Sequence, residues 1–151
     1  MIPITGVLVA EHRMFCSVFD QIEEILPTVS SLVKIKRLTR LVEGLLLSHA
    51  KAEDDLLQLL GKHGRQDNGR YARMRKEHQE VDARITRVYL TNKVDVARGL
   101  LSAALAASRR HFSREERLVF PLIQKVVAPE ILARLGTIWF MRKHVPANWS
   151  L

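Results

Sequence analysis

Apolar residues recur along most of the chain at alternating steps of three and four, and runs of alternating β-branched residues are absent. This periodicity is typical of helices that each bury one apolar stripe. Proline and glycine residues mark the boundaries between these helices. The predicted helical segments are 5–26, 28–60, 69–91 and 93–127, followed by a shorter fifth helix from 129 to about 143.

Each of the four long segments carries one histidine near the middle of its stripe. The first stripe contains Leu8, His12, Phe15, Phe19, Ile22 and Leu26. The second contains Ile35, Leu38, Val42, Leu45, His49, Ala52, Leu56 and Leu59. The third contains Tyr71, Met74, His78, Val81, Ile85 and Val88, and the fourth contains Leu101, Ala104, Ser108, His111, Glu115, Leu118 and Leu122. Short turns favour antiparallel neighbours, so we predict an all-α, up-down-up-down antiparallel four-helix bundle with a short fifth C-terminal helix.

Length and composition are those of one globular domain covering residues 1–151, with 47% hydrophobic and 26% charged residues. No apolar run approaches the ~20 residues that a membrane span needs, so no membrane partner is expected. The amino terminus lacks the pattern of a secretory signal, and the expected location is cytoplasmic. Cys16 is the only cysteine, which excludes an internal disulfide and a CxxC motif.

The formal net charge of +8 raises the question of an acidic partner. The densest basic stretch, residues 62–76, holds six Lys or Arg residues against one Asp. Such stretches are usually solvated faces, and no nucleic-acid-binding motif accompanies this one, so nucleic acid is not a favoured partner. A metal-free interaction domain that uses the basic 62–76 face is kept as an alternative function.

The four stripe histidines can converge on one layer of an antiparallel bundle, where they would crowd the core with polar groups unless they bind something. Glu53 follows His49 by four residues, and Glu115 follows His111 by four, so each carboxylate shares a helix face with its histidine. Either glutamate alone would equally suit a surface ion pair. The repeated HxxxE pattern favours metal ligation, because a buried carboxylate needs a cation.

Imidazole and carboxylate ligands suit iron, manganese or zinc. Six protein ligands with bridging carboxylates suit two metals better than one. We therefore predict two iron ions bridged by carboxylates and an oxo/hydroxo group, with manganese or zinc as alternatives. The Glu-x-x-His pattern of ferritin-like sites and the HExxH pattern of zinc proteases are both absent.

Four stretches, EHRMF, SHAKAEDDLL, KEHQEVD and HFSREERLVFPL, resemble the hemerythrin-like, or HHE cation-binding, domain over roughly residues 8–125. The resemblance implies a non-haem di-iron centre with His12, His49, His78 and His111 as terminal ligands. Glu53 and Glu115 would be its bridging carboxylates.

Two positions depart from the oxygen-carrying members of that family. Their further histidine, four residues after the one in the third helix, is replaced here by Asp82, which puts reversible oxygen carriage in doubt. Asp82 could be an extra ligand, an acceptor for an imidazole or a surface acid. Their fourth-helix aspartate corresponds to Glu116, which helical geometry turns about 100° away from Glu115, and we choose Glu115 as the ligand with Glu116 as the alternative.

The resulting functional hypothesis is a non-haem di-iron protein that binds or senses O2, NO or peroxide, or that sequesters iron. Its partner would be that small diatomic ligand or peroxide, and the chain would be a monomer or a homodimer. The alternative is a di-iron enzyme, namely a nitric oxide reductase, a peroxidase or an iron–sulfur repair factor. We rank the enzyme lower, because the sequence offers no general acid beyond the metal ligands. Trp139, Phe140 and Met141 are expected to form an apolar group that caps the bundle, with a dimer contact as the less favoured role.

Overall fold

The computed structural model describes residues 1–62 and 69–144, and this part of the chain is helical with no strand. Its elements are α1 (Ile4–Ile25), the short 3-10 turn η1 (Leu26–Thr28), α2 (Leu32–Lys62), α3 (Arg70–Leu90), α4 (Val94–Arg114), the π-helical turn η2 (Glu115–Val119), α5 (Phe120–Val126) and α6 (Pro129–His144). The predicted all-α class is confirmed. Within the described ranges, no helix combines the length and the apolar character that a membrane crossing requires.

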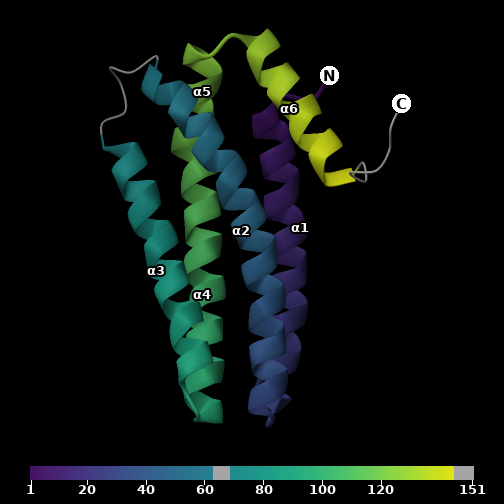
Figure 1. Cartoon of the computed structure of the whole chain (residues 1–151), viewed down its shortest axis with the longest axis vertical. Helices are drawn as coiled ribbons and strands as arrows, with labels where there is room; N and C mark the ends of the chain where they lie inside the picture. The colour runs from purple at the N-terminus through teal and green to yellow at the C-terminus, as the bar shows by residue number, and fades with distance from the viewer. Residues whose placement is uncertain (63–68, 145–151) are drawn as a thin grey trace.

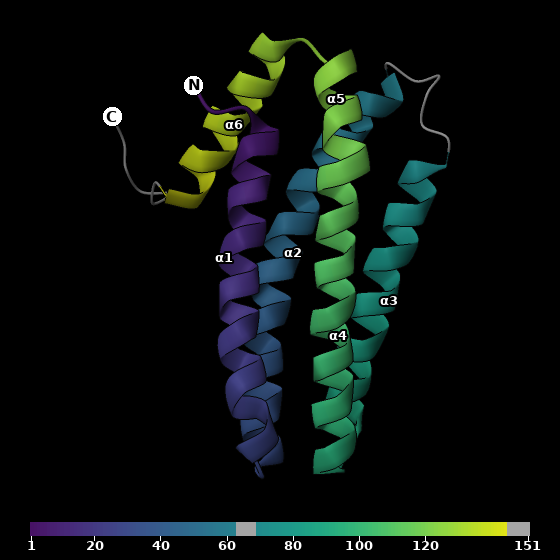
Figure 2. The same cartoon turned by 180° about the vertical axis from the view of Figure 1, so that it is seen from behind.

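The four long helices α1 to α4 run along the longest axis of the molecule, with α1 beside α2 and α3 beside α4 (Figures 1 and 2). Helix α5 continues the line of α4, and α6 turns back to lie against α1 at the end where the chain begins. Helices α2 and α4 contact each other between the two pairs. Side chains from all four long helices can therefore meet in the interior.

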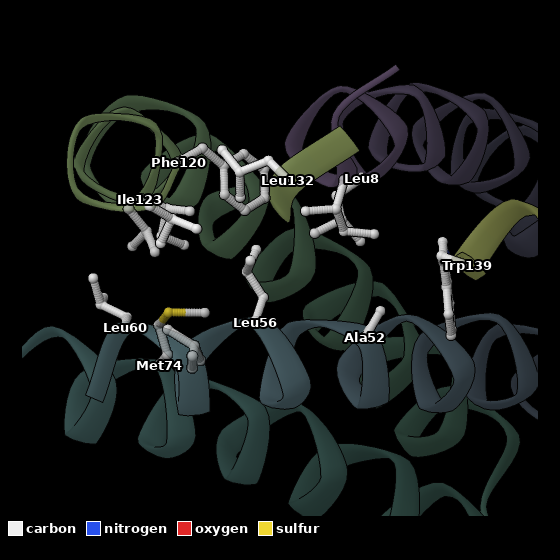
Figure 3. Packing of buried hydrophobic residues seen from close by; sticks show 13 residues of the cluster. Leu8, Ala52, Leu56, Leu60, Met74, Phe120, Ile123, Leu132 and Trp139 are labelled. Atoms are coloured by element: carbon white, nitrogen blue, oxygen red, sulfur yellow. The ribbon is translucent and has the colours of Figure 1, made fainter. Parts of the chain in front are cut away.

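Two apolar clusters fill that interior. One joins Leu8, Leu56, Phe120 and other residues near α5 and α6 (Figure 3), and the other contains Phe15 and Leu105. Along α1 and at the first residue of η1, the predicted stripe is buried at every position from Leu8 to Leu26. The histidine of that stripe lies in sequence between the two clusters, so the polar layer separates two apolar blocks.

The fourth predicted segment is not one regular α-helix, because the backbone widens to a π-helical turn at Glu115–Val119. The N–H of Phe120 donates to the carbonyl of Glu115, five residues earlier. The next residue, Pro121, has no N–H to donate, and a π turn is one way in which a helix accommodates such a loss.

The extra residue in this turn shifts the buried stripe beyond Glu115 by one position. The prediction that Leu118 and Leu122 lie on the buried stripe is therefore wrong in register. Leu118 is 48% exposed and Leu122 is half-buried, whereas Val119 and Ile123 are buried.

The predicted apolar group in the last helix is only partly formed. Trp139 is buried in the first cluster, at its edge in Figure 3, but Phe140 and Met141 are 54% and 48% exposed. One face of α6 packs on α1, so three consecutive residues cannot all enter the core.

Within the predicted basic stretch, residues 63–68 lie outside the described part of the chain.

Candidate metal centre

The four stripe histidines meet as two pairs that face each other through their Nε2 atoms. His12 on α1 and His49 on α2 have their Nε2 atoms 2.9 Å apart, and we call them the inner pair. His78 on α3 and His111 on α4 have theirs 2.8 Å apart, and we call them the outer pair. The side chains of the inner pair are 2% exposed, whereas that of His78 is 22% exposed.

The two predicted bridging carboxylates lie between the pairs. Glu53 places Oε1 2.5 Å from the Nε2 atom of His49 and Oε2 3.1 Å from that of His78. Glu115 places Oε2 3.3 Å from an Nε2 atom of the inner pair and Oε1 3.4 Å from one of the outer pair. Each carboxylate therefore directs one oxygen to each pair.

These six residues form two overlapping sets of four ligand atoms. Within each set all four atoms lie within 4.8 Å of one another, and Glu53 and Glu115 belong to both sets. Their four carboxylate oxygens are buried and accept no hydrogen bond from the described residues. A buried carboxylate without a donor is costly unless a cation compensates it, so this donor set fits bound metal ions.

The other ring nitrogen of three of these histidines explains why the shared carboxylates lack donors. The Nδ1–H groups of His12, His49 and His111 donate to three further glutamates at 2.7–2.8 Å. A carboxylate can only accept, so each of these rings carries a proton on Nδ1 and turns its Nε2 atom into the layer. A metal ion would bind at that Nε2 atom, with the ring held by the type of partner usual for ligating histidines.

The partners of these Nδ1 atoms come from neighbouring helices and were not predicted. His49 donates to Glu11 on α1, and His111 donates to Glu77 on α3. A sequence signal exists, because Glu11 and Glu77 each directly precede a stripe histidine. Each nevertheless bonds to the histidine of the next helix along the chain, which the sequence pattern alone does not reveal.

Cations lie behind two of these carboxylates. Arg114 on α4 pairs with Glu77, and Lys143 on α6 pairs with Glu11 at 2.9 Å. Burial raises the pKa of Glu11, but its bonds with His49 and Lys143 outweigh burial and lower the pKa to about 2. Glu11 is therefore an anion at neutral pH.

The two shared carboxylates have opposite pKa shifts in the absence of a cation. Burial and the negative charge of Glu53 raise the pKa of Glu115 well above its usual value. Burial also acts to raise the pKa of Glu53, but the charge of His49 and the close approach of the surrounding histidine rings lower it well below its usual value. Burial alone would lower the pKa of His49, yet the charge and close approach of Glu53 and the bond to Glu11 raise it to about 9. Without metal, the layer thus holds protons where a cation would supply positive charge.

The less certain ligand candidates lie outside both four-atom sets. Glu116 accepts the bond from Nδ1 of His12, so it approaches the site from behind that ring. Asp82 is exposed and lines a neighbouring cavity. Burial raises its pKa, an effect that the charge of His78 opposes and that of Glu43 reinforces. Cys16 is a half-buried free thiol that packs against the second apolar cluster.

A cavity of about 500 Å³ lies between α2, α3 and α4 and reaches the metal layer. Its inner wall includes His49, Glu53 and both members of the outer pair. Apolar side chains such as Val81 and Ile85 line it further along α3, together with acidic residues near the surface. A molecule in this cavity would meet the outer pair.

Four histidines, three of them buried, and two buried glutamates shared between them are the kind of site that binds cations in helical proteins. The model of the hemerythrin HHE cation-binding domain matches residues 4–123, and the chain belongs to that family. The match ends before α6 begins. Searches of curated proteins and of solved structures found no match.

Proposed function

We propose that this protein holds two iron ions within an up-down-up-down antiparallel bundle. The inner pair would bind one ion, the outer pair would bind the other, and Glu53 and Glu115 would bridge them. The observation that carries the proposal is the pair of four-atom ligand sets that share both carboxylates. The buried carboxylate oxygens without hydrogen bonds support it, because two cations would satisfy all four.

The donor types favour iron over softer metals. Imidazole nitrogen and carboxylate oxygen are ligands that iron, manganese and zinc accept, whereas copper(I) prefers thiolate or thioether. Membership in a cation-binding family supports metal ligation but does not choose among these ions. We propose iron, with manganese or zinc as the outcomes that metal analysis would reveal.

We further propose that the centre binds O2, NO or peroxide, for sensing or sequestration, in a single cytoplasmic domain. Bound iron would supply open coordination positions and reversible electron transfer to such a ligand. The chain's own residues supply access and exclusion of water. The cavity leads to His78, whereas Phe112 stacks on the ring of His12 with the centroids 4.2 Å apart and covers one face of that ring.

The size of the cavity favours one alternative. At about 500 Å³ it exceeds what a diatomic ligand needs and falls within the range of sites for small organic molecules. A di-iron enzyme acting on a larger oxidant, such as an organic peroxide, is therefore the second candidate. Turnover of nitric oxide or peroxides above that of free iron would favour the enzyme over the sensor.

Metal content tests the proposal directly. The protein is loaded with iron(II) without oxygen, desalted and analysed for metal per chain, and its near-ultraviolet absorption is recorded before and after air. Two irons per chain are expected, with loss of iron in His49→Ala and His111→Ala. The control is His63→Ala, which changes a histidine outside the stripes. Full metal retention in both ligand variants would refute the ligand set.

A further inference from the structure

Helix α6 is linked to the metal layer through one intermediate residue, although it lies outside the matched family region. The connection runs through Glu11 on α1, whose two carboxylate oxygens have different partners. Oε2 accepts the Nδ1–H bond of His49 at 2.7 Å. Oε1 accepts a bond from Nε1–H of Trp139 at 3.1 Å and pairs with Nζ of Lys143 at 2.9 Å. The carboxylate is thus held between α6 and a candidate metal ligand.

The two α6 residues also hold each other in place. The Lys143 ammonium lies 4.9 Å from the centroid of the Trp139 ring, within the range of a cation–π contact. Trp139 is 8% exposed and belongs to the apolar cluster that also includes Leu8 of α1. Its ring position is therefore set by packing, and its N–H is directed at Glu11 (Figure 3 shows the ring at the edge of this cluster).

The outer pair has an equivalent arrangement that does not need α6. There, Glu77 accepts the Nδ1–H bond of His111 and pairs with Arg114, and all three residues lie inside the matched region. At the inner pair, the cation behind the carboxylate comes from α6. The two halves of the site thus have the same order of groups, histidine, carboxylate and cation, but only one half depends on the last helix.

We propose that Trp139 and Lys143 are positioning residues of the metal centre. They fix Glu11, which in turn orients the ring of His49 and keeps its proton on Nδ1, so that Nε2 is available to the metal. This inference rests on the proposed metal site. Loss of the hydrogen-bonding partner of a ligating histidine typically weakens metal binding by about 10–100-fold, and loss of the two α6 groups acts on that same partner.

The test compares α6 variants of the full chain by competition between the protein and a chelator for iron(II) without oxygen. The Trp139→Phe/Lys143→Met double variant should bind one of its two irons about 10–100-fold more weakly, with the second unchanged. The Trp139→Phe/Lys143→Arg variant keeps the positive charge at position 143. It should bind that iron more tightly than the Trp139→Phe/Lys143→Met variant does. Arg142→Met removes the charge of the neighbouring exposed residue of α6 and should bind as the unchanged protein does.

A second measurement separates positioning from a general loss of structure. Cobalt(II) absorption bands report the ligand geometry, and the double variant should alter the bands of one ion only, with helix content by circular dichroism unchanged. In a Glu11→Gln background the α6 substitutions should have little further effect on affinity, because the path passes through Glu11.

The outcomes distinguish the two proposals. Binding of two irons by all α6 variants with unchanged affinity would overturn the positioning role while leaving the metal site intact. The positioning role would also be overturned if the α6 substitutions weakened iron binding as much in the Glu11→Gln background as they do in the otherwise unchanged chain. Lys143 and Trp139 would then act by another route. Failure of the unchanged protein to bind iron would refute the proposed function, and the positioning role with it.

Discussion

Glu115→Gln should have opposite effects on stability with and without metal. In the metal-free protein, Glu115 is 0% exposed, and its pKa is raised by burial and by the charge of Glu53. The unfolded chain releases that proton near the usual pKa of 4.5, whereas the folded chain keeps it to higher pH. Folding therefore takes up a proton above that pH, and the free energy of unfolding falls as pH rises.

The size of the effect follows from this proton. A single carboxyl group changes stability by about 1.4 kcal/mol per pH unit between its unfolded and folded pKa values. The loss begins near pH 5 and continues up to the pH at which the folded chain releases the proton of Glu115. His49, whose pKa is raised from 6.5 to about 9, and Glu53, whose pKa is lowered from 4.5, add slopes of their own near their unfolded pKa values. The Glu115→Gln chain keeps both groups, so the comparison with the unchanged chain isolates the proton of Glu115.

Urea denaturation of chelator-treated protein between about pH 5 and about pH 7 measures the difference. The stability of Glu115→Gln relative to the unchanged chain should increase with pH, by at most about 1.4 kcal/mol per pH unit. The exposed Glu24→Gln variant measures how much change comes from net charge alone. With saturating iron(II) the sign should reverse, because the variant has lost a ligand and gains less from binding. Parallel pH curves for Glu115→Gln and the unchanged metal-free protein would refute the reasoning.

Further substitutions test three other parts of the structure. Glu53→Gln should reduce bound iron at both positions, whereas His78→Ala should spare one ion, as elemental analysis would count; equal losses would contradict the shared-carboxylate arrangement. Ile123→Ala should destabilise the fold by about 2–5 kcal/mol, because Ile123 is 0% exposed. Leu118→Ala should destabilise it by no more than about 0.5 kcal/mol, because Leu118 is 48% exposed. Denaturant titration that gave the reverse order would contradict the π-turn register. Phe112→Ala should cost about 3–5 kcal/mol in thermal or urea unfolding, since the ring is 3% exposed and packs in the core beside the inner pair, and a neutral result would contradict that packing.

The helices and the positions of the histidines could be predicted from the sequence, because a period near 3.5 residues determines which face of a helix is buried. His12, His49 and His111 are all buried, and each faces the interior as the stripes require. The register beyond Glu115 could not be predicted in the same way. Pro121 signals a missing hydrogen bond, but the sequence does not indicate which upstream turn widens to compensate.

The partners of the histidines depend on contacts between helices, so periodicity could not identify them. Glu11 and Glu77 stand beside one histidine in sequence and bond to another in space. Lys143 lies 132 positions after Glu11, and its contact depends on how α6 turns back against α1. Glu116 was expected to point away from the metal layer, and it reaches His12 from the outside of the ring.

The unequal burial of the two histidine pairs has a kinetic consequence for a metal-loaded protein. The inner pair is 2% exposed, and the lining of the described cavity includes both histidines of the outer pair but only His49 of the inner pair. An inner ion would therefore be open to the cavity on the His49 side alone, with His12 behind it. The two ions would then differ in residence time, with the inner ion a long-lived part of the fold and the outer ion the one that exchanges and meets incoming molecules.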